Sequence, residues 1–210
     1  MAIEKSLDNI LNSRSKIAII RLFISKTADF RATGREVAKL IKVSPPATHA
    51  SLKELYTEGV LKLDIIGKQH IYSMDDGNRV VERILKPMFK KELSVKSEIK
   101  NFLLRHARKS GMENKIVSVI LYGSLQRGKT NAGSDVDIAV IIKNKNDRKE
   151  IEDKFLNEIS TDFNRYFKTH LDVYIKTQDE FRMRLGRNLP PVSTLAKSYS
   201  VLWGKELSDI

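Results

Sequence analysis

The chain has 210 residues, a hydrophobic content of 41% and a net charge of +12, which together argue against wholesale disorder. It has no cysteine, which excludes disulfides and thiolate metal sites. The opening residues, MAIEKSLDNI, lack the apolar run of a signal peptide, and no later segment is apolar over the length of a membrane span. We therefore expect a soluble, cytoplasmic protein that makes no contact with a membrane.

The positive charge is unevenly spread along the sequence. Residues 1–74 carry 12 Lys/Arg against 7 Asp/Glu, residues 75–110 carry 10 against 5, and residues 111–210 carry 16 against 14. A polyanionic partner should therefore meet the first half of the chain. The same charge would also serve solubility alone, and composition leaves both interpretations open.

The first half of the sequence has the pattern of three helices followed by a hairpin. Apolar residues recur at helical spacing over residues 13–26, 33–41 and 44–59. Leu40 should face inward in the second of these helices. Ser44 should cap the third helix, with Pro45 in its first turn, where a missing N–H does no harm. The run LKLDIIGKQHIYSM predicts two strands joined at Gly67-Lys68.

A second helical pattern continues from Asn78 to about Ser110 and is interrupted by Pro87. Proline lacks an N–H and clashes with the preceding turn, so it should end or kink a helix near Lys86. We place the boundary between two domains just after this point, which gives residues 1–90 and 91–210.

The second half of the sequence alternates strands with helices. The runs KIVSVILYG, VDIAVII and HLDVYIK are typical of strands, and residues 148–167 have apolar side chains four apart, as in an amphipathic helix. This order predicts an α/β unit with a mixed sheet.

The segment LYGSLQRGKTNAGSDVDIAV carries residues suited to phosphate chemistry. Gly123 and Ser124 directly follow a strand and open a short helix, whose first N–H groups favour a phosphate. Asp135 and Asp137 stand two apart at the start of the next strand, so both should face the same side. Asp172 lies within a third apolar strand, where a carboxylate needs a partner such as a metal ion. Three carboxylates can hold two Mg²⁺ ions that act on a phosphoryl group.

The order Gly-Ser, ten residues, Asp-x-Asp and a later strand aspartate resembles the minimal nucleotidyltransferases of the DNA polymerase β-type superfamily. The resemblance covers roughly residues 95–210. It extends to Arg127-Gly128, to Ser134 and to the C-terminal run VLWGKEL. The pair Leu125-Gln126 departs from the family pattern, in which many members have an Arg-Ala-like pair.

This resemblance implies roles for individual residues. Gly123 and Ser124 would hold the phosphates of ATP or another NTP, while Arg127 and Lys129 would neutralise phosphate charge. The family's catalytic and metal-binding positions, which would hold two Mg²⁺ ions, correspond to Asp135, Asp137 and Asp172. The last of these acids would also help to deprotonate an acceptor hydroxyl.

The first half resembles the winged helix-turn-helix of bacterial and archaeal transcriptional regulators. The run VSPPATHASLKELYTEGVL would contain the recognition helix, with His49 and Lys53 toward the major groove and Lys68 at the wing tip near phosphates. The expected groove face has no Arg, Asn or Gln, so base readout should be weak. A winged helix used for dimerisation or protein contact is the alternative.

These observations predict the fold class α+β, with an N-terminal winged helix-turn-helix and a C-terminal polymerase β-like nucleotidyltransferase domain. The leading function is Mg²⁺-dependent transfer of a nucleoside monophosphate, AMP from ATP in the first instance, to a hydroxyl. One alternative is a transcriptional or antitoxin-type regulator that uses the second domain as a nucleotide sensor. Another is a bifunctional regulator that binds DNA and modifies a partner. Duplex DNA and an NTP are the expected partners, while a protein acceptor and a homodimer stay open.

Overall fold

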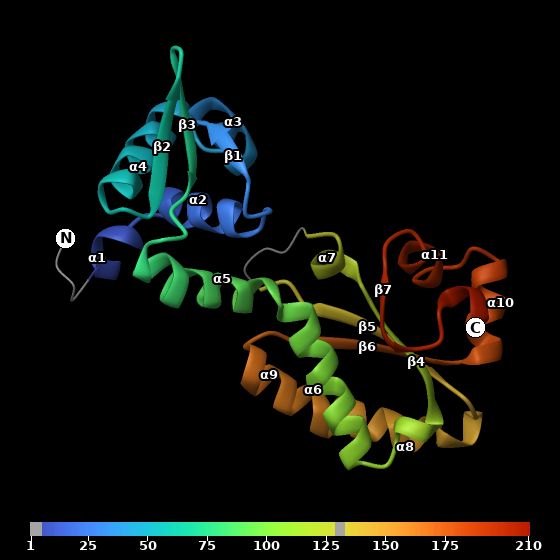
Figure 1. Ribbon diagram of the computed structural model, residues 1–210. Coiled ribbons are helices and arrows are strands. Elements are labelled where there is room, and N and C mark those ends of the chain that lie inside the picture. Colours follow the sequence, from blue (N-terminus) through green and yellow to red (C-terminus); the bar gives the residue numbers. More distant parts are fainter. Residues whose placement is uncertain (1–5, 129–132) are drawn as a thin grey trace. The chain divides into compact units, whose positions relative to one another are not determined.

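The computed structural model describes residues 6–128 and 133–210, and the chain divides into two compact units, Met1–Val95 and Lys96–Ile210 (Figure 1). Over these residues each unit has its own sheet, with three strands in the first and four in the second. The predicted class, α+β, is confirmed. The boundary expected after residue 90 stays a prediction about where the two units can be separated. Within the described ranges, no helix is both long enough and apolar enough to cross a membrane.

The first unit has the element order of a winged helix. Its elements are α1 Ser6–Ile10, α2 Arg14–Ile24, β1 Arg31–Thr33, α3 Gly34–Ile41, α4 Pro45–Thr57, β2 Leu61–Ile66, β3 Gln69–Met74, a π-helical segment Val81–Leu85, and α5 Lys86–Leu93. The sheet order is β1-β3-β2, and both pairs are antiparallel. The hairpin of β2 and β3 projects beyond the helices as the wing (Figure 1). The sequence pattern did not predict β1, which is three residues long.

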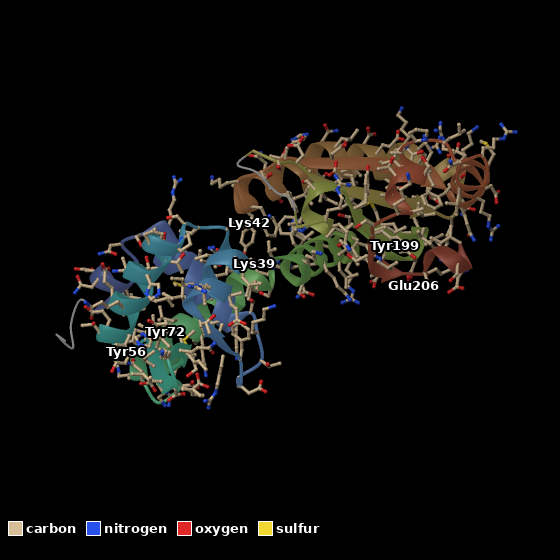
Figure 2. All side chains as sticks on the ribbon, turned by 90° about the horizontal axis from the view of Figure 1, so that it is seen from above. Lys39, Lys42, Tyr56, Tyr72, Tyr199 and Glu206 are labelled. Carbon is tan, nitrogen blue, oxygen red and sulfur yellow. The ribbon has the colours of Figure 1, made fainter. Side chains whose placement is uncertain are left out.

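The core of the first unit follows the predicted pattern with one exception. Leu52 and Leu55 of α4 are fully buried, and Tyr72 of β3 is 3% exposed, whereas Tyr56 is 48% exposed; Figure 2 labels both tyrosines. The prediction that Leu40 faces inward is wrong, because that side chain is 50% exposed. The 3.6-residue period places Ala38 in the buried stripe of α3 instead.

Two expectations about helix ends are confirmed only in part. Ser44 is the N-cap of α4, but its hydroxyl makes no capping hydrogen bond. The second helical residue, Pro46, has no N–H, which removes one of the two donors that such a hydroxyl normally binds. The helical geometry changes at Lys86, as expected near Pro87: a π-helical segment ends at Leu85, and α5 begins at Lys86 with Pro87 in its first turn. The chain leaves helical geometry only at Ser94, so Pro87 does not end the helix.

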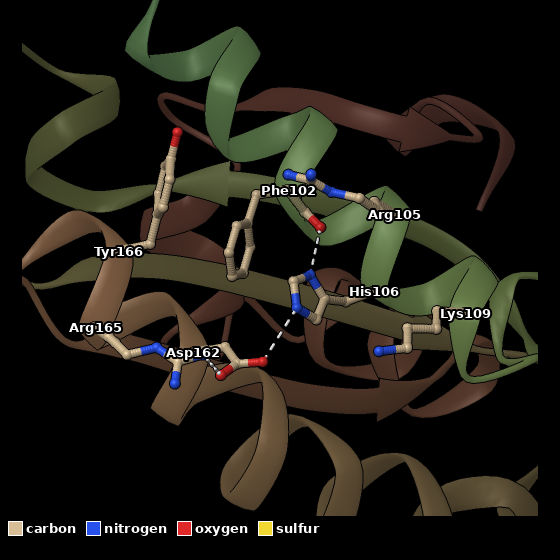
Figure 3. A pocket seen from close by; sticks show the side chains of 7 residues that line it. All are labelled: Phe102, Arg105, His106, Lys109, Asp162, Arg165 and Tyr166. Atoms are coloured by element: carbon tan, nitrogen blue, oxygen red, sulfur yellow. Dashed lines mark hydrogen bonds and ion pairs between the residues drawn. The ribbon is translucent and has the colours of Figure 1, made fainter.

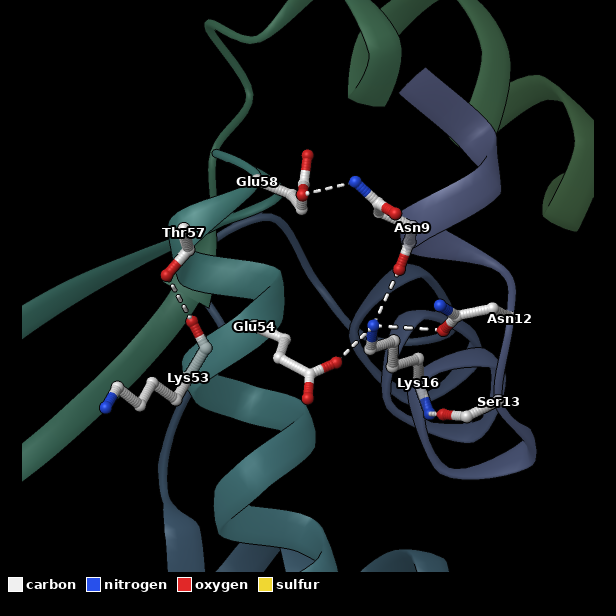
Figure 4. Close-up of polar contacts among 8 residues, drawn as sticks. All are labelled: Asn9, Asn12, Ser13, Lys16, Lys53, Glu54, Thr57 and Glu58. Atoms are coloured by element: carbon white, nitrogen blue, oxygen red, sulfur yellow. Dashed lines mark hydrogen bonds and ion pairs between the residues drawn. The ribbon is translucent and has the colours of Figure 1, made fainter. Parts of the chain in front are cut away.

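A buried lysine joins α1 and α2 to α4. Lys16 is 3% exposed. Its ammonium donates to the carbonyl of Asn9 at 2.6 Å and to Oδ1 of Asn12 at 3.0 Å, and it forms an ion pair with Glu54 (Figure 4). A buried cation is tolerated only with such partners. The recognition-helix candidate α4 is therefore fixed to the N-terminal helices by polar as well as apolar contacts.

The second unit is a mixed sheet covered by helices on both faces. Its elements are α6 Val95–Lys109, β4 Ile116–Tyr122, α7 Gly123–Gln126, β5 Val136–Ile142, α8 Arg148–Asp153, a π-helical segment Lys154–Ile159, α9 Ser160–Phe167, β6 Leu171–Thr177, α10 Gln178–Gly186, α11 Val192–Leu195 and β7 Ser200–Gly204, with short 3-10 turns at Glu113–Lys115, Lys145–Asp147 and Leu207–Asp209. The strand order is β6-β5-β4-β7, with β5 and β6 parallel and the other pairs antiparallel. Figure 1 shows α6, α8 and α9 along one face of the sheet and α10 and α11 on the other.

The helical run from α8 to α9, on the first of these faces, departs from regular α geometry. The four apolar residues predicted to face the core are all buried: Ile151, Phe155, Ile159 and Phe163. A spacing of four exceeds the 3.6-residue period, so these side chains would wind off one face of a straight α-helix. The π-helical segment between α8 and α9 has more residues per turn. It therefore keeps all four side chains in the core.

The edge strand β7 was not predicted, although its residues carry part of the family resemblance. It pairs antiparallel with β4, and Ser118 donates from its hydroxyl to the carbonyl of Lys205 at 2.8 Å. Gly204 has φ +96°, and a Cβ there would lie 2.2 Å from the carbonyl oxygen of Val117. The glycine is thus required by the close approach of two backbones.

Candidate functional site

The predicted carboxylates lie at one end of three neighbouring strands. β4 ends where β5 and β6 begin, with Tyr122 in register with Asp137, and Asp137 in register with Asp172. Side chains in register on adjacent strands share a face of the sheet. Asp135 precedes Asp137 by two residues and Ala139 follows it by two, and Ala139 belongs to the apolar cluster formed with α10 and α11. Asp137 and Asp172 therefore lie beyond the end of that cluster, on the same face, while Asp135 precedes β5 and is near enough for its charge to act on Asp137.

Gly123 and Asp137 occupy adjoining space so closely that no larger residue fits at position 123. Gly123 has φ +75°, and a Cβ built on it would lie 1.8 Å from Oδ2 of Asp137 and 2.6 Å from its Cγ. Distances this short are steric overlap, and this φ also disfavours other residues. The glycine of the Gly-Ser pair thus makes room for the carboxylate, whereas the sequence pattern had suggested only close approach of a ligand to the backbone.

The electrostatics of the site centre on Asp137. Burial raises the pKa of this half-buried carboxyl, and the negative charges of Asp172 and Asp135 raise it further. The backbone N–H of Ser124 donates to it, and this bond and the nearby Arg127 act in the opposite direction. Burial, with Asp172 and Asp137 as charged neighbours, likewise raises the pKa of the phenol of Tyr122. A cation bound among these carboxylates would relieve their repulsion.

Asp135 and Asp172 are both exposed, whereas Asp137 is half-buried. The expectation that Asp172 needs a partner to offset burial in an apolar strand is wrong, because its side chain is exposed. In the part of the chain that the structure describes, no three acidic or histidine side chains form a ready metal-binding group.

The remaining predicted nucleotide-binding residues occupy the turn after β4. Ser124 is half-buried in the first turn of α7, and its N–H is already engaged by Asp137. Arg127 follows α7 and is exposed. Lys129 lies outside the described residues.

Gln126 fixes α7 in place, a role that the sequence did not reveal. Its side-chain oxygen accepts from Nζ of Lys96 at 2.8 Å and from Oγ of Ser200 at 2.9 Å, and its NH₂ donates to the carbonyl of Tyr199 at 3.0 Å. The residue that departs from the family pattern therefore ties the turn after β4 to the start of α6 and to β7. No local sequence signal identifies such a contact, because its partners are 30 and 74 residues away.

The predicted DNA-contacting residues of the first unit do not all lie together. His49, Lys53 and Lys68 are all exposed. His49 and Lys68 line one hollow of about 380 Å³ between α4 and the wing. Lys53 lines a different hollow, beside Lys16 and the N-terminal helices.

The hollow between α4 and the wing contains residues that sequence analysis missed. Arg35 from the start of α3, and Gln69 and His70 from β3, line it together with His49. The His49 ring packs over Gly34, where a Cβ would lie 3.3 Å from its Nε2. Arg and Gln are side chains suited to phosphates and base edges, and their positions outside α4 explain why inspection of the helix alone did not find them.

Comparison with known proteins assigns the second unit. Residues 96–195 match the family model of the nucleotidyltransferase domain. No curated protein matches the chain.

Several solved structures align with part of the chain. A homodimeric winged helix-turn-helix DNA-binding domain from Mycobacterium bovis is 15% identical, covering 42% of this chain and 77% of that one, with a TM-score of 0.35. HlyU from Vibrio cholerae is 14% identical over 42% and 96%, with a TM-score of 0.35. A toxin–antitoxin structure with AMP-PNP is 17% identical over 52% and 77%, with a TM-score of 0.33. By its own element order and sheet topology the first unit is a winged helix-turn-helix, and the second unit matches the nucleotidyltransferase domain model over residues 96–195.

Proposed function

We propose that this protein is a Mg²⁺-dependent nucleotidyltransferase that transfers a nucleoside monophosphate, AMP from ATP in the first instance, to a hydroxyl acceptor. The observation that carries the proposal is the position of Asp137. It is held against Gly123 and repelled by Asp135 and Asp172, in a domain of the nucleotidyltransferase family. A family glycine followed by a serine, and three acids at one strand end, are the parts that such a reaction needs.

The donor set fits the proposed metal. Carboxylate oxygens are hard ligands suited to Mg²⁺, and Asp135, Asp137 and Asp172 would hold the ions together with phosphate oxygens of the NTP. When bound, Mg²⁺ neutralises the charge that develops on the phosphates. The open arrangement of the three acids agrees with a site that is completed by its nucleotide.

The chain's own residues would position the two reactants. Ser124 and the turn at Gly123 would orient the β- and γ-phosphates, and exposed Arg127 would add positive charge. Asp172 would accept the proton of the acceptor hydroxyl, whose oxygen forms the new bond to the α-phosphorus. The bond from that phosphorus to the bridging oxygen breaks, and pyrophosphate leaves.

We also propose that the first unit binds duplex DNA through Arg35, His49 and Lys68. In the described parts of the chain, none of the three forms an ion pair, so all remain available to phosphates. A regulator that senses nucleotide without transferring it is the second candidate function, favoured by this open basic hollow. The two candidates differ in one respect, since a sensor binds an NTP and releases no pyrophosphate.

The test is to incubate the purified protein with ATP, GTP, CTP and UTP, each labelled at the α-phosphate, with Mg²⁺ and cell extract as the source of acceptor. Pyrophosphate release with label transfer to a macromolecule supports the enzyme. Asp153→Asn is the matched control for Asp135→Asn, because Asp153 is an exposed acid on α8, outside the proposed site. Nucleotide binding without transfer from any of the four donors would support the sensor instead.

A further inference from the structure

The charge of the molecule is distributed differently from what the sequence segments suggested. When the sequence is divided between Val95 and Lys96, the first unit holds 17 Lys/Arg against 11 Asp/Glu and the second holds 21 against 15. Each unit therefore carries a net charge of +6. Much of the second unit's excess lies on α6, which has five Lys/Arg and one Glu. The winged helix is therefore not the only basic part of the protein.

A hollow of about 410 Å³ opens between α6 and α9 (Figure 3). Its lining residues from α6 are Phe102, Arg105, His106 and Lys109, and those from α9 are Asp162, Arg165 and Tyr166. This volume falls within the usual range for small-molecule sites. Three permanent cations face one carboxylate, which gives the lining a net charge of +2 with the histidine neutral.

The hollow has a rigid aromatic base. Phe102 is 5% exposed and lies within 6 Å, between ring centroids, of His106, Phe163, Tyr166 and Phe167. The ring of Tyr166 is stacked on that of Phe102, with an angle of 29° between their planes, yet Tyr166 remains 65% exposed. Phe102 thus lies between the rings of His106 and Tyr166, and the exposed ring of Tyr166 at the rim of the hollow offers a surface to a flat ligand.

Some polar side chains of the hollow already pair with one another, and two cations do not. Asp162 accepts from Arg165 at 2.6 Å and lies 3.4 Å from Nε2 of His106, whose Nδ1 lies 2.9 Å from the carbonyl of Phe102 (Figure 3). Over the residues that the structure describes, Arg105 and Lys109 have no anionic partner. Two exposed cations one helical turn apart can thus meet the same anionic group.

We propose that this hollow is a second ligand site, which takes a nucleoside phosphate, either as a free nucleotide or as a residue of a single-stranded nucleic acid. The base packs against the exposed ring of Tyr166 at the rim of the hollow, and the phosphate lies within the hollow, where it meets the guanidinium of Arg105 and the ammonium of Lys109. The site lies on the face of the sheet covered by α6 and α9, whereas the acids of the proposed active site lie on the face covered by α10 and α11. Its ligand is therefore additional to the NTP of the proposed reaction.

The experiment measures binding to the full-length protein in EDTA, so that its result does not depend on the proposed metal site. AMP, inorganic phosphate and a short oligoadenylate are titrated separately, by calorimetry. The double substitution Arg105→Gln with Lys109→Gln should weaken AMP binding at least about ten-fold, because it removes two charge-assisted contacts. Tyr166→Ala should weaken AMP binding and leave phosphate binding unchanged. Lys100→Gln, an exposed lysine on α6 that does not line the hollow, should change neither.

The outcomes separate the sources of the ligand. Oligoadenylate binding that is much tighter than AMP binding, and sensitive to the same substitutions, assigns the site to a nucleic acid strand. Equal affinities assign it to the free nucleotide. The proposal is overturned if wild-type protein binds neither AMP nor oligoadenylate in EDTA. It is overturned likewise if the Arg105/Lys109 double variant binds AMP and oligoadenylate as tightly as the wild type does. It is also overturned if Lys100→Gln weakens binding as much as the double substitution.

Discussion

At the scale of single residues, the contact between Gly123 and Asp137 is the most exacting feature of the second unit. The carboxylate fills the space where any other residue at position 123 would place its Cβ. Asp137 in turn accepts the N–H of Ser124, so the strand β5 and the turn after β4 are positioned by one side chain. Geometry and charge at the proposed site therefore depend on the same carboxylate.

The first prediction concerns Gly123→Ala. The added Cβ must displace Asp137, and misplacement of a reacting group by about 1 Å can lower turnover about 10²-fold. Gly111→Ala is the matched control, because Gly111 also has a positive φ (+69°) but nothing lies within 4 Å of the place that a Cβ would take there. Both variants bear similar backbone strain, so kcat should fall only for Gly123→Ala. Equal losses of kcat in the two would show that strain, rather than the clash with Asp137, is responsible.

The second prediction uses the raised pKa of Asp137. The pKa of Asp137 is higher in the folded than in the unfolded state. Its carboxyl therefore adds to the free energy of unfolding at low pH, and this contribution is lost as the pH rises through the raised pKa. Asp137→Asn should therefore raise the melting temperature at neutral pH in EDTA, and this gain should shrink as the pH falls. Mg²⁺ with an ATP analogue should stabilise the wild type and not the variant. A variant that melts below the wild type at neutral pH in EDTA would contradict the account.

At the scale of elements, the short helix α7 is held by contacts that come from distant parts of the chain. Gln126 connects it to Lys96 at the start of α6 and to Ser200 and Tyr199 near β7. A helix of four residues has little stability of its own, so its orientation rests on these hydrogen bonds.

The third prediction is that Gln126→Ala lowers the free energy of unfolding by about 1–3 kcal/mol, since it removes the side-chain acceptor of Lys96 and Ser200 and leaves the Tyr199 carbonyl without its donor. Gln126→Glu keeps an acceptor for Lys96 and Ser200 and should recover part of the loss. Denaturant unfolding and steady-state kinetics of both variants test this, with exposed Asn164→Ala as the control. If the alanine variant unfolds like Asn164→Ala, the hydrogen bonds to Gln126 do not hold α7.

Elements with a strong local pattern were the ones that the sequence could predict. A periodic or continuous apolar pattern predicted helices α2, α3, α4 and α6, the helical run of residues 148–167, and strands β2 to β6. The strands β1 and β7 are short and depend on pairing with distant partners, so local pattern did not reveal them. The site divides in the same way: the spacing of Asp135 and Asp137 placed them on one face, but Gln126 and Arg35 gain their positions only from tertiary contacts.

At the scale of the whole molecule, two basic units of equal net charge share one chain. The positive charges of the two units lie on different surfaces. In the first unit they line the hollow between α4 and the wing, and in the second they gather on α6. Salt dependence measured on the intact protein must therefore be assigned to a unit by substitution.

The fourth prediction is that duplex DNA binds the first unit mainly through phosphates. Affinity should fall steeply with salt, with a log-log slope of about −0.9 per phosphate neutralised. Arg35→Ala or Lys68→Ala should each reduce that slope by about one and weaken all duplexes alike. Lys39→Ala, an exposed lysine of α3 outside the hollow, is the control. Gel shifts that are insensitive to salt, or to both substitutions, would rule out this surface.

The most direct test of the central claim is calorimetry of a non-hydrolysable ATP analogue with Mg²⁺ and with EDTA, because it does not require the acceptor. Wild-type protein should bind the analogue much more tightly with Mg²⁺. Asp135→Asn and Asp137→Asn should remove this difference, and Asp153→Asn should retain it. Equal affinity with Mg²⁺ and with EDTA, or undiminished Mg²⁺ dependence in both site variants, would contradict the assignment of these carboxylates as the metal ligands.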